Sequence, residues 1–335
     1  MDSDLETASV REWPGGWLQV KVPLPYSLKW VNAYLLPGDN GWTLIDPGLR
    51  TPESEKLWEQ TLADKGIHWA AIKRIVLTHH HPDHYGLAGW FQERSGGAPV
   101  WMSDEAGRAA WMMWGEGETF SARMLEAMRR HGLPQELTEA MREHLSGFRG
   151  RVSPHPTEVR TLKAGGKFEM AGTEWTLIGG EGHGPGHLSF YDPRGRRILC
   201  GDQVLPDISP NIGWLPEGDP NPLASFMDSL KFMLDLEVDL AFPGHRDPFG
   251  RFRDRLVDLL AHHERRLERL IALIGSDALS SFEICERLFG ARLRSNPHNL
   301  RFALAETIAH LLLLERRGLL RQVNGGGTWR GAADT

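Results

Sequence analysis

The chain has 335 residues, a formal net charge of −6 and 41% hydrophobic residues. This length and composition allow a sizeable core and about two domains, and the acidic balance excludes a general attraction to nucleic acids or anionic membranes. The two cysteines have no metal-binding or redox spacing, the acidic start is unlike a secretory signal, and no apolar run is long enough to span a membrane. We therefore expect a protein of the reducing cytoplasm.

The N-terminal part is expected to alternate strands and helices. Strands are expected near Trp17–Val22, Asn32–Leu36 and Trp42–Asp46, and a helix is expected from about Pro52 to Lys65. The β-branched and apolar run Ile75–Leu77 predicts a further, buried strand.

Directly after this strand, four potential metal ligands fall within six residues in the pattern H-x-H-x-D-H. They are His79, His81, Asp83 and His84. In an extended segment His79 and His81 point to the same side, whereas His80 points away. Imidazole and carboxylate are the preferred ligands of zinc and similar divalent ions, so the motif predicts a metal site with enough ligands for more than one ion.

Three later segments repeat this plan, each with a candidate ligand after a short apolar run. His183 follows Thr176–Ile178, Asp202 follows Arg197–Leu199, and His245 follows Leu240–Phe242. Layered α/β proteins place their chemistry at the carboxyl ends of strands. Each residue alone is equally well explained as a solvated loop histidine or a helix cap, but together with the first motif they favour a metal centre.

Two segments are candidates for the substrate pocket. A helical region at about residues 104–150 is rich in methionine and tryptophan, and Met113 and Trp114 are its candidate substrate contacts, with ordinary core packing as the alternative. A loop rich in proline and glycine follows Asp202, and its candidate contacts are Asn211 and Trp214.

The region from residue 251 to residue 335 predicts helices followed by a hairpin, which is typical of a winged-helix module. The expected elements are helices Arg253–Ile274 and Asn299–Arg317, a helix cap at Ser280–Glu283, and strands Leu319–Val323 and Thr328–Arg330 around a glycine-rich tip. The region has fourteen arginines and ten acidic residues. This small excess agrees with packing or a homodimer contact, and nucleic-acid binding is the alternative.

The order and context of these motifs, from about Val31 to Pro248 and including Leu44–Gly48, resemble the metallo-β-lactamase superfamily of hydrolases. The resemblance implies an α/β fold, a four-layer αββα sandwich over residues 1–250 with an insertion at about 104–150. A small winged-helix-like α+β domain would follow over residues 251–335.

The resemblance also implies a binuclear site for two divalent metal ions, zinc first, with iron or manganese as alternatives. One ion would be bound by His79, His81 and His183, the other by Asp83, His84 and His245, with Asp202 bridging both. Asp83 and Asp202 would be catalytic, because they would orient the attacking hydroxide. No flavin domain or other organic cofactor is indicated.

Four further residues are expected to support the ligands. Asp46 matches an aspartate that supports the site in relatives, although a turn residue before Pro47 is the alternative. Thr78 could hydrogen-bond a ligand carboxylate or fill a strand end, and His187 is expected to order the loop of the site. Asp247 is expected to hold the second nitrogen of His245.

The expected function is hydrolysis of a thioester, ester or lactone of a small, apolar or aromatic substrate. The alternatives are an endoribonuclease acting on single-stranded RNA, as some relatives with a similar winged helix are, and weak β-lactam hydrolysis as a side activity. The best-known β-lactamases use a cysteine where this chain has Asp202, and Cys200 lies two residues too early. A small molecule is the expected partner, rather than a nucleic acid or a membrane.

Overall fold

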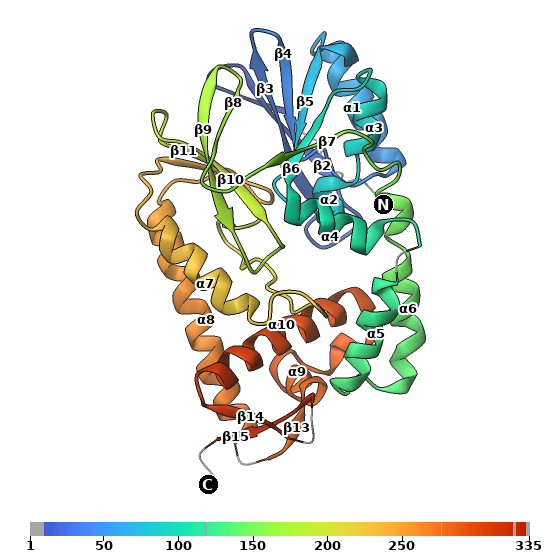
Figure 1. Ribbon diagram of the computed structural model, residues 1–335, viewed down its shortest axis with the longest axis vertical. Helices are drawn as coiled ribbons and strands as arrows, with labels where there is room; N and C mark the ends of the chain where they lie inside the picture. The colour runs from blue at the N-terminus through green and yellow to red at the C-terminus, as the bar shows by residue number, and fades with distance from the viewer. Residues whose placement is uncertain (1–9, 118, 276, 324–325, 333–335) are drawn as a thin grey trace, which may run out of the picture.

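The computed structural model describes residues 10–117, 119–275, 277–323 and 326–332. Two β-sheets face each other with helices on their outer sides, and a helical region with a small third sheet lies at one end (Figure 1). The predicted αββα sandwich with a C-terminal α+β module is confirmed. The acidic start at residues 1–9 and the hairpin tip at 324–325 lie outside the described residues.

The first sheet has seven strands in the sequence order β1 to β7. Neighbouring strands are antiparallel from β1 to β4 and parallel from β4 to β7. The strands are β1 Val10–Trp13, β2 Trp17–Pro23, β3 Trp30–Gly38, β4 Gly41–Ile45, β5 Ile72–Val76, β6 Val100–Ser103 and β7 Val159–Leu162.

The second sheet has five strands in the order β12-β11-β10-β9-β8. Only the β11–β12 pair is parallel, with Leu199 opposite Phe242. The strands are β8 Lys167–Met170, β9 Thr173–Gly180, β10 His187–Asp192, β11 Arg197–Gly201 and β12 Leu240–Pro243. Every residue of β10 is buried, because this central strand is covered on both faces.

Three apolar clusters hold the layers together. The cluster between the sheets joins residues of the first sheet, such as Tyr34 and Val76, to Trp175, Phe190 and Phe242 of the second. The other two clusters fill the space between each sheet and its outer helices. This division follows from strand alternation, since successive side chains point to opposite faces of a sheet.

The helices of the first half cover the outer face of the seven-stranded sheet, and the insertion continues them toward the C-terminal region (Figure 1). They are α1 Pro52–Asp64, α2 Pro82–Tyr85, α3 Ala88–Arg94, α4 Asp104–Trp114, α5 Phe120–Arg130 and α6 Thr138–Ser146, with short 3-10 helices at Trp69–Ala71, Gln135–Leu137 and Arg149–Arg151. Thr51 caps α1 through the N–H of Ser54, and Pro52 is suited to its first turn.

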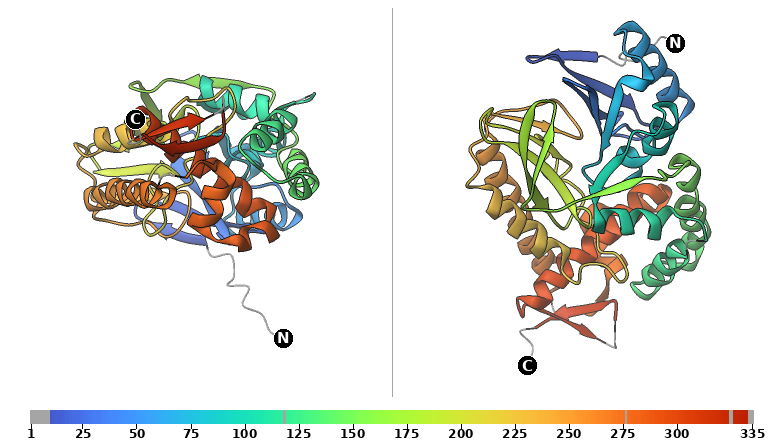
Figure 2. Two further views of the ribbon diagram at one scale, coloured as in Figure 1. Left: turned by 90° about the horizontal axis from the view of Figure 1, so that it is seen from below. Right: turned by 45° about the horizontal axis from the view of Figure 1, so that its top comes forward.

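The C-terminal region packs across one end of the sandwich. Its long helix α10 contacts α6 of the insertion and α7 of the second half, and Figure 2 shows it passing beneath the two sheets. The elements are α7 Pro222–Met233, α8 Phe252–Ile274, α9 Ser281–Phe289, a 3-10 helix Ala291–Ser295, α10 Pro297–Arg316, and strands β13 Leu279–Ser280, β14 Leu320–Val323 and β15 Thr328–Gly331. The predicted cap at Ser280 is confirmed as a capping box with Glu283. Within the described residues, no helix is long and apolar enough to cross a membrane.

Candidate metal centre

The structure brings the predicted ligands together at one end of the two sheets. The first motif follows β5, and His183, Asp202 and His245 follow β9, β11 and β12. The seven side chains form three overlapping groups. Within each group, the ligand atoms lie within 4.8 Å of one another. The groups are His79, His81 and His183; His79, His84 and Asp202; and Asp83, His84 and His245.

In the first group, three imidazole nitrogens converge. Nε2 of His79 lies 2.9 Å from Nδ1 of His81 and 3.3 Å from Nε2 of His183. Burial lowers the pKa of His79 and His81 well below the ordinary value, so both rings are neutral. Neutral imidazoles that direct nitrogen lone pairs at a shared point are suited to binding a cation.

Asp202 lies between the two halves of the cluster. Its carboxylate oxygens lie 3.5 Å from Nε2 of His183, 3.4 Å from Nε2 of His84 and 3.3 Å from Nε2 of His245. Asp83 lies 3.2 Å from Nε2 of His245. Asp202 therefore has the central position that a bridging ligand requires.

The second group has acidic partners that change its protonation. Burial opposes a charge on His84, but the carboxylates of Asp202 and Asp46 outweigh burial and raise the pKa well above its ordinary value. Asp202 likewise raises the pKa of His245 to about 10 against the effect of burial. A bound divalent cation would take the place of these protons.

The donor set fits a pair of divalent metal ions. Nε2 of His84 and Oδ1 of Asp202 are buried and face each other at 3.4 Å in the centre of the cluster, and neither has a hydrogen bond to any residue that the structure describes. Gly244 leaves the space open, since a Cβ there would lie 2.2 Å from Oδ1 of Asp202. Such buried, unpartnered polar atoms are costly unless another group binds them.

The outward-facing ring nitrogens are held by backbone carbonyls. Nδ1 of His183 donates to the carbonyl oxygen of Asn211 at 2.9 Å, and Nδ1 of His245 donates to that of Trp30 at 2.9 Å. These bonds fix each tautomer and leave Nε2 free for a ligand role. The prediction that Asp247 holds His245 is therefore wrong: Asp247 is exposed and forms an ion pair with Lys21 at 3.1 Å.

Asp46 and Thr78 contact the histidines of the first motif through hydrogen-bonding groups. Asp46 adopts a left-handed backbone conformation, with φ of 48°, and accepts hydrogen bonds from Nδ1 of His84 at 2.9 Å and from the Thr78 hydroxyl at 2.7 Å. The Thr78 hydroxyl in turn lies 2.9 Å from Nδ1 of His79. Thr78 thus contacts a supporting carboxylate rather than a ligand carboxylate, and the strained Asp46 backbone is typical of a functional site.

His187 is placed where it orders the loop that carries Asp202. The Asp202 N–H donates to Nε2 of His187 at 3.2 Å, and His187 is completely buried. His80 is also buried, and neither of its ring nitrogens has a partner among the described residues. It belongs to none of the three ligand groups, in keeping with its predicted direction.

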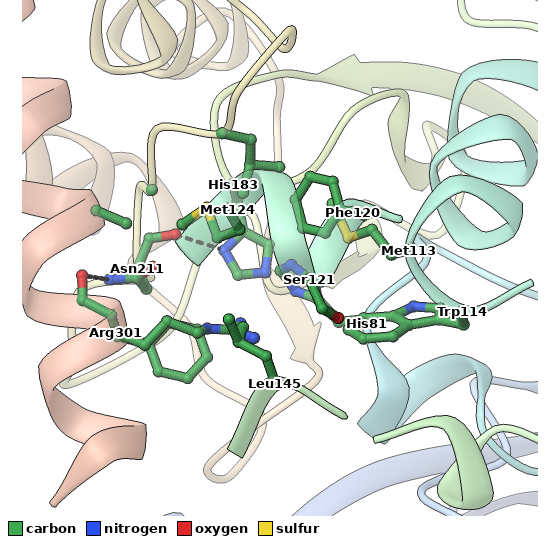
Figure 3. Close-up of a pocket in the computed structure, with 14 residues that line it drawn as sticks. His81, Met113, Trp114, Phe120, Ser121, Met124, Leu145, His183, Asn211 and Arg301 are labelled. Atoms are coloured by element: carbon green, nitrogen blue, oxygen red, sulfur yellow. Dashed lines mark hydrogen bonds between the residues drawn. The ribbon is translucent and has the colours of Figure 1, made fainter. Parts of the chain in front are cut away.

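A cavity of about 260 Å³ opens next to the centre and has Asp83, Asp202 and His245 in its wall. A second, smaller cavity adjoins it and is lined by Met113 and Trp114 of the insertion (Figure 3). The insertion therefore borders the site through two of its predicted residues, and both are also packed in the core.

The loop after Asp202 also forms part of the wall. Asn211 lines both cavities, but its side chain is occupied by a hydrogen bond to Glu306 at 3.0 Å, so it fastens the loop to α10. Trp214 lies elsewhere, against the ring of His131 at 5.1 Å, and lines neither of these two cavities. This placement does not support the predicted contact of Trp214 with the substrate, because the loop turns its ring toward α5.

Several wall residues were not predicted from the sequence, and they come from far along the chain. Tyr26 precedes the first motif, Phe148 lies near the end of the insertion, and His298, Arg301 and Phe302 lie on α10. No motif marks them. A polar position on a long helix gives no sign of which side will meet a distant metal centre.

Comparison with known proteins agrees with this geometry. The family model described as the metallo-beta-lactamase superfamily matches residues 31–245, and a model described as the metallo-beta-lactamase-like C-terminal domain matches residues 267–332. The probable metallo-hydrolase YqjP of Bacillus subtilis (strain 168) is 26% identical over 318 residues, which cover 93% of this chain and 96% of that protein.

Two further proteins are similar to this one. The crystal structure of the metallo-beta-lactamase family protein TTHA1429 from Thermus thermophilus has a TM-score of 0.84 at 35% identity, covering 95% of this chain and 99% of that one. A hydroxyacylglutathione hydrolase of Synechococcus sp. (strain JA-2-3B'a(2-13)) is 26% identical over 188 residues, 56% of this chain and 52% of that protein. The chain belongs to the metallo-β-lactamase superfamily, as an enzyme with a metal site.

Proposed function

We propose that the protein is a hydrolase that cleaves a thioester, ester or lactone of a small, apolar or aromatic substrate in the cytoplasm, with two zinc ions at its centre. The observation that carries this proposal is the position of Asp202, which lies within 3.5 Å of ligand nitrogens from both halves of the cluster and faces a largely apolar cavity. An acyl compound placed in that cavity would meet the metal centre directly.

The groups of ligand atoms indicate which residues would bind each metal ion. One ion would be held by His79, His81 and His183. The other ion would be held by Asp83, His84 and His245, and Asp202 would contact both ions. Bound divalent ions lower the pKa of a coordinated water and polarise a substrate carbonyl.

The protein's own carboxylates orient the attacking water. Asp83 lies in the cavity wall and is only partly buried, so its free oxygen can accept a hydrogen bond from that water. Asp202 is buried at the centre of the cluster. The carbonyl bonds of His183 and His245 keep their ligand nitrogens aimed during turnover.

The substrate class is supported by the cavity and by one relative. Met113 and Phe120 line the smaller cavity and Phe148 the larger one, and apolar walls of this kind favour an acyl chain or an aromatic ring. The similar Synechococcus protein is named for an acyl-glutathione compound, which is a thioester. β-Lactam hydrolysis is left as a side activity, because Cys200 is buried and donates to the carbonyl of Val204 instead of reaching the centre.

Two arginines of the C-terminal module are paired with acidic residues and so give no support for RNA as the substrate. Arg294 forms an ion pair with Glu286 at 2.6 Å, and Arg317 forms one with Glu264 at 2.7 Å. Sequence-independent binding of nucleic acids depends on lysines and arginines that contact the phosphates. RNA cleavage therefore remains the second function to be tested.

A metal-defined hydrolysis screen tests the proposal. Purified protein, with its metal content measured by elemental analysis, is offered thioesters, lactones, a chromogenic β-lactam and labelled single-stranded RNA. We expect about two metal ions per chain, as the ligand set implies, and chelator-sensitive turnover of a thioester or lactone. Cleavage of RNA alone would contradict the proposal.

A pair of variants tests the assignment of the bridging ligand. Asp202→Ala is expected to fold but to bind metal weakly and to have little turnover. Asp247→Ala is the matched control, because Asp247 is exposed and pairs with Lys21. Full activity of Asp202→Ala, or equal losses in both variants, would refute the central role of Asp202.

A further inference from the structure

Arg301 stands out among the residues near the metal centre, because it is charged and has no acidic partner in the described part of the chain. It lies on α10 and lines both cavities, together with His81 and His183. Figure 3 shows Arg301 and Asn211 on one side of the pocket and Trp114 on the other. Among the residues that the structure describes, no hydrogen bond or ion pair joins its guanidinium to a neighbour.

The other half-buried arginines nearby are occupied. Arg266 of α8 forms an ion pair with Glu306, which lies on α10 as Arg301 does. Arg255 donates to the carbonyl oxygens of Leu205 at 2.6 Å and Ile208 at 2.8 Å. A guanidinium carries five N–H donors, and shielding them from water without acceptors is unfavourable. Arg301 is partly buried and lines both cavities without such an acceptor among the described residues, so its donors are available to a ligand there.

Aromatic rings hold the Arg301 side chain in place. Its guanidinium carbon lies 4.4 Å from the ring centroid of Phe302 and 5.6 Å from that of Phe148. Such cation–π contacts restrict the side chain without using its N–H groups. Burial lowers the pKa of Arg301 to about 10, so the group stays charged at neutral pH.

The other described residues of this wall, apart from the metal centre, carry no charge that competes with Arg301. His298 lines the larger cavity and stacks on Tyr26 at 4.6 Å, and burial lowers the pKa of His298 to about 4, so it is neutral at pH 7. The carboxylates in the cavity wall, Asp83 and Asp202, belong to the metal centre. The cavity thus has its metal site in one wall and a single fixed guanidinium in another.

We propose that Arg301 recognises an anionic group, a carboxylate or a phosphate, on a part of the substrate away from the bond that is cleaved. A guanidinium binds such groups through two parallel N–H···O bonds, which a neutral substrate cannot form. This inference rests on the proposed hydrolase function and narrows its substrates to acyl compounds that carry a negative charge at a distance from the scissile carbonyl.

The kinetic test compares matched substrates. Three acyl thioesters of equal chain length end in a carboxylate, a phosphate or a methyl ester, and only the last is neutral. We expect the wild type to prefer one of the anionic compounds by about 10-fold to 100-fold in kcat/KM, the range for a hydrogen bond to a charged group. Arg301→Ala should remove this preference by raising KM for the anionic compound, with the neutral compound changed less than about threefold.

Two more variants separate recognition from structure. Arg301→Lys keeps the charge without the paired geometry and should retain part of the preference. Arg316→Ala removes an exposed arginine from the end of the same helix and should behave as the wild type. If the wild type hydrolyses the three compounds equally, or if Arg301→Ala slows all of them alike, Arg301 does not recognise an anion, and the hydrolase function would still stand.

Direct binding gives a result that does not depend on turnover. Calorimetry with metal-free protein would use phenylacetate and phenyl phosphate as anionic probes and phenylacetamide as the neutral one. We expect the wild type to bind one of the anions at least 10-fold more tightly than the amide, and Arg301→Ala to bind all three equally weakly. If both proteins bind the anions equally, the proposal for Arg301 is wrong. If the wild type shows the expected binding but hydrolyses none of the compounds tested, only the proposed hydrolase function is wrong.

Discussion

Glu306 connects the C-terminal module to the metal centre through a chain of buried contacts. It forms an ion pair with Arg266 of α8 and accepts a hydrogen bond from the side chain of Asn211 at 3.0 Å. The carbonyl of Asn211 then holds the ligand His183. A change at Glu306 is therefore expected to affect both stability and the site.

We expect Glu306→Ala to lower the free energy of unfolding by about 3 kcal/mol. The side chains of Arg266 and Glu306 are only 18% and 11% exposed, so the variant leaves a nearly buried guanidinium unpaired. Removing one partner of a buried pair costs about 3–5 kcal/mol, and the remaining water contact places this pair at the low end of the range. Urea denaturation measures the loss as a lower midpoint with an unchanged slope.

A double-mutant cycle and a surface control complete this test. Arg266→Ala with Glu306→Ala should lose less than the two single losses together, because neither charge is then left alone. Glu174→Ala breaks the exposed pair with Lys167 and should change stability by less than about 1 kcal/mol. Additive losses in the cycle, or a loss at Glu306 no larger than the surface control, would refute the buried coupling.

Three other changes have effects that the structure defines. Asp46→Asn should weaken metal affinity about 10-fold to 100-fold, because it weakens the hydrogen bonds that orient the first motif, and a metal titration with exposed Asp39→Asn as control checks this. His263 and His310 are buried and 3.2 Å apart, and burial lowers their pKa values to about 2 and 3. Below about pH 6.5 the unfolded chain binds protons at these residues and the folded chain does not. The free energy of unfolding should therefore fall as the pH is lowered from about 6.5 to 4, and it should fall less steeply in His310→Gln. Urea midpoints that change in parallel in the two proteins would contradict this. Met113→Ala should shift substrate preference toward bulkier acyl groups, measured as a ratio of kcat/KM values, and an unchanged ratio would show that Met113 is only core.

Local patterns in the sequence were enough to predict the candidate ligands and most elements. The H-x-H-x-D-H spacing follows a short apolar strand, and the later ligands follow strands of the same kind, so strand ends alone placed seven candidates in one region. The helix expected at Arg253–Ile274 is found at Phe252–Ile274, and the cap at Ser280 is formed as predicted. Such signals depend on neighbours within a few residues and are therefore visible in a sequence.

Contacts between distant segments decided the rest. The partner of His245 is the carbonyl of Trp30, 215 positions away, and every residue offers a carbonyl, so no side chain marks it. Trp214 lies against His131 because of the path of its loop. Arg301 faces the cavity only because α10 packs beneath the sheets. The sequence by itself thus determined the chemistry of the metal ligands, since that depends on residue type and spacing, whereas the supporting partners and the substrate wall required the tertiary structure, since they depend on which faces of remote elements meet.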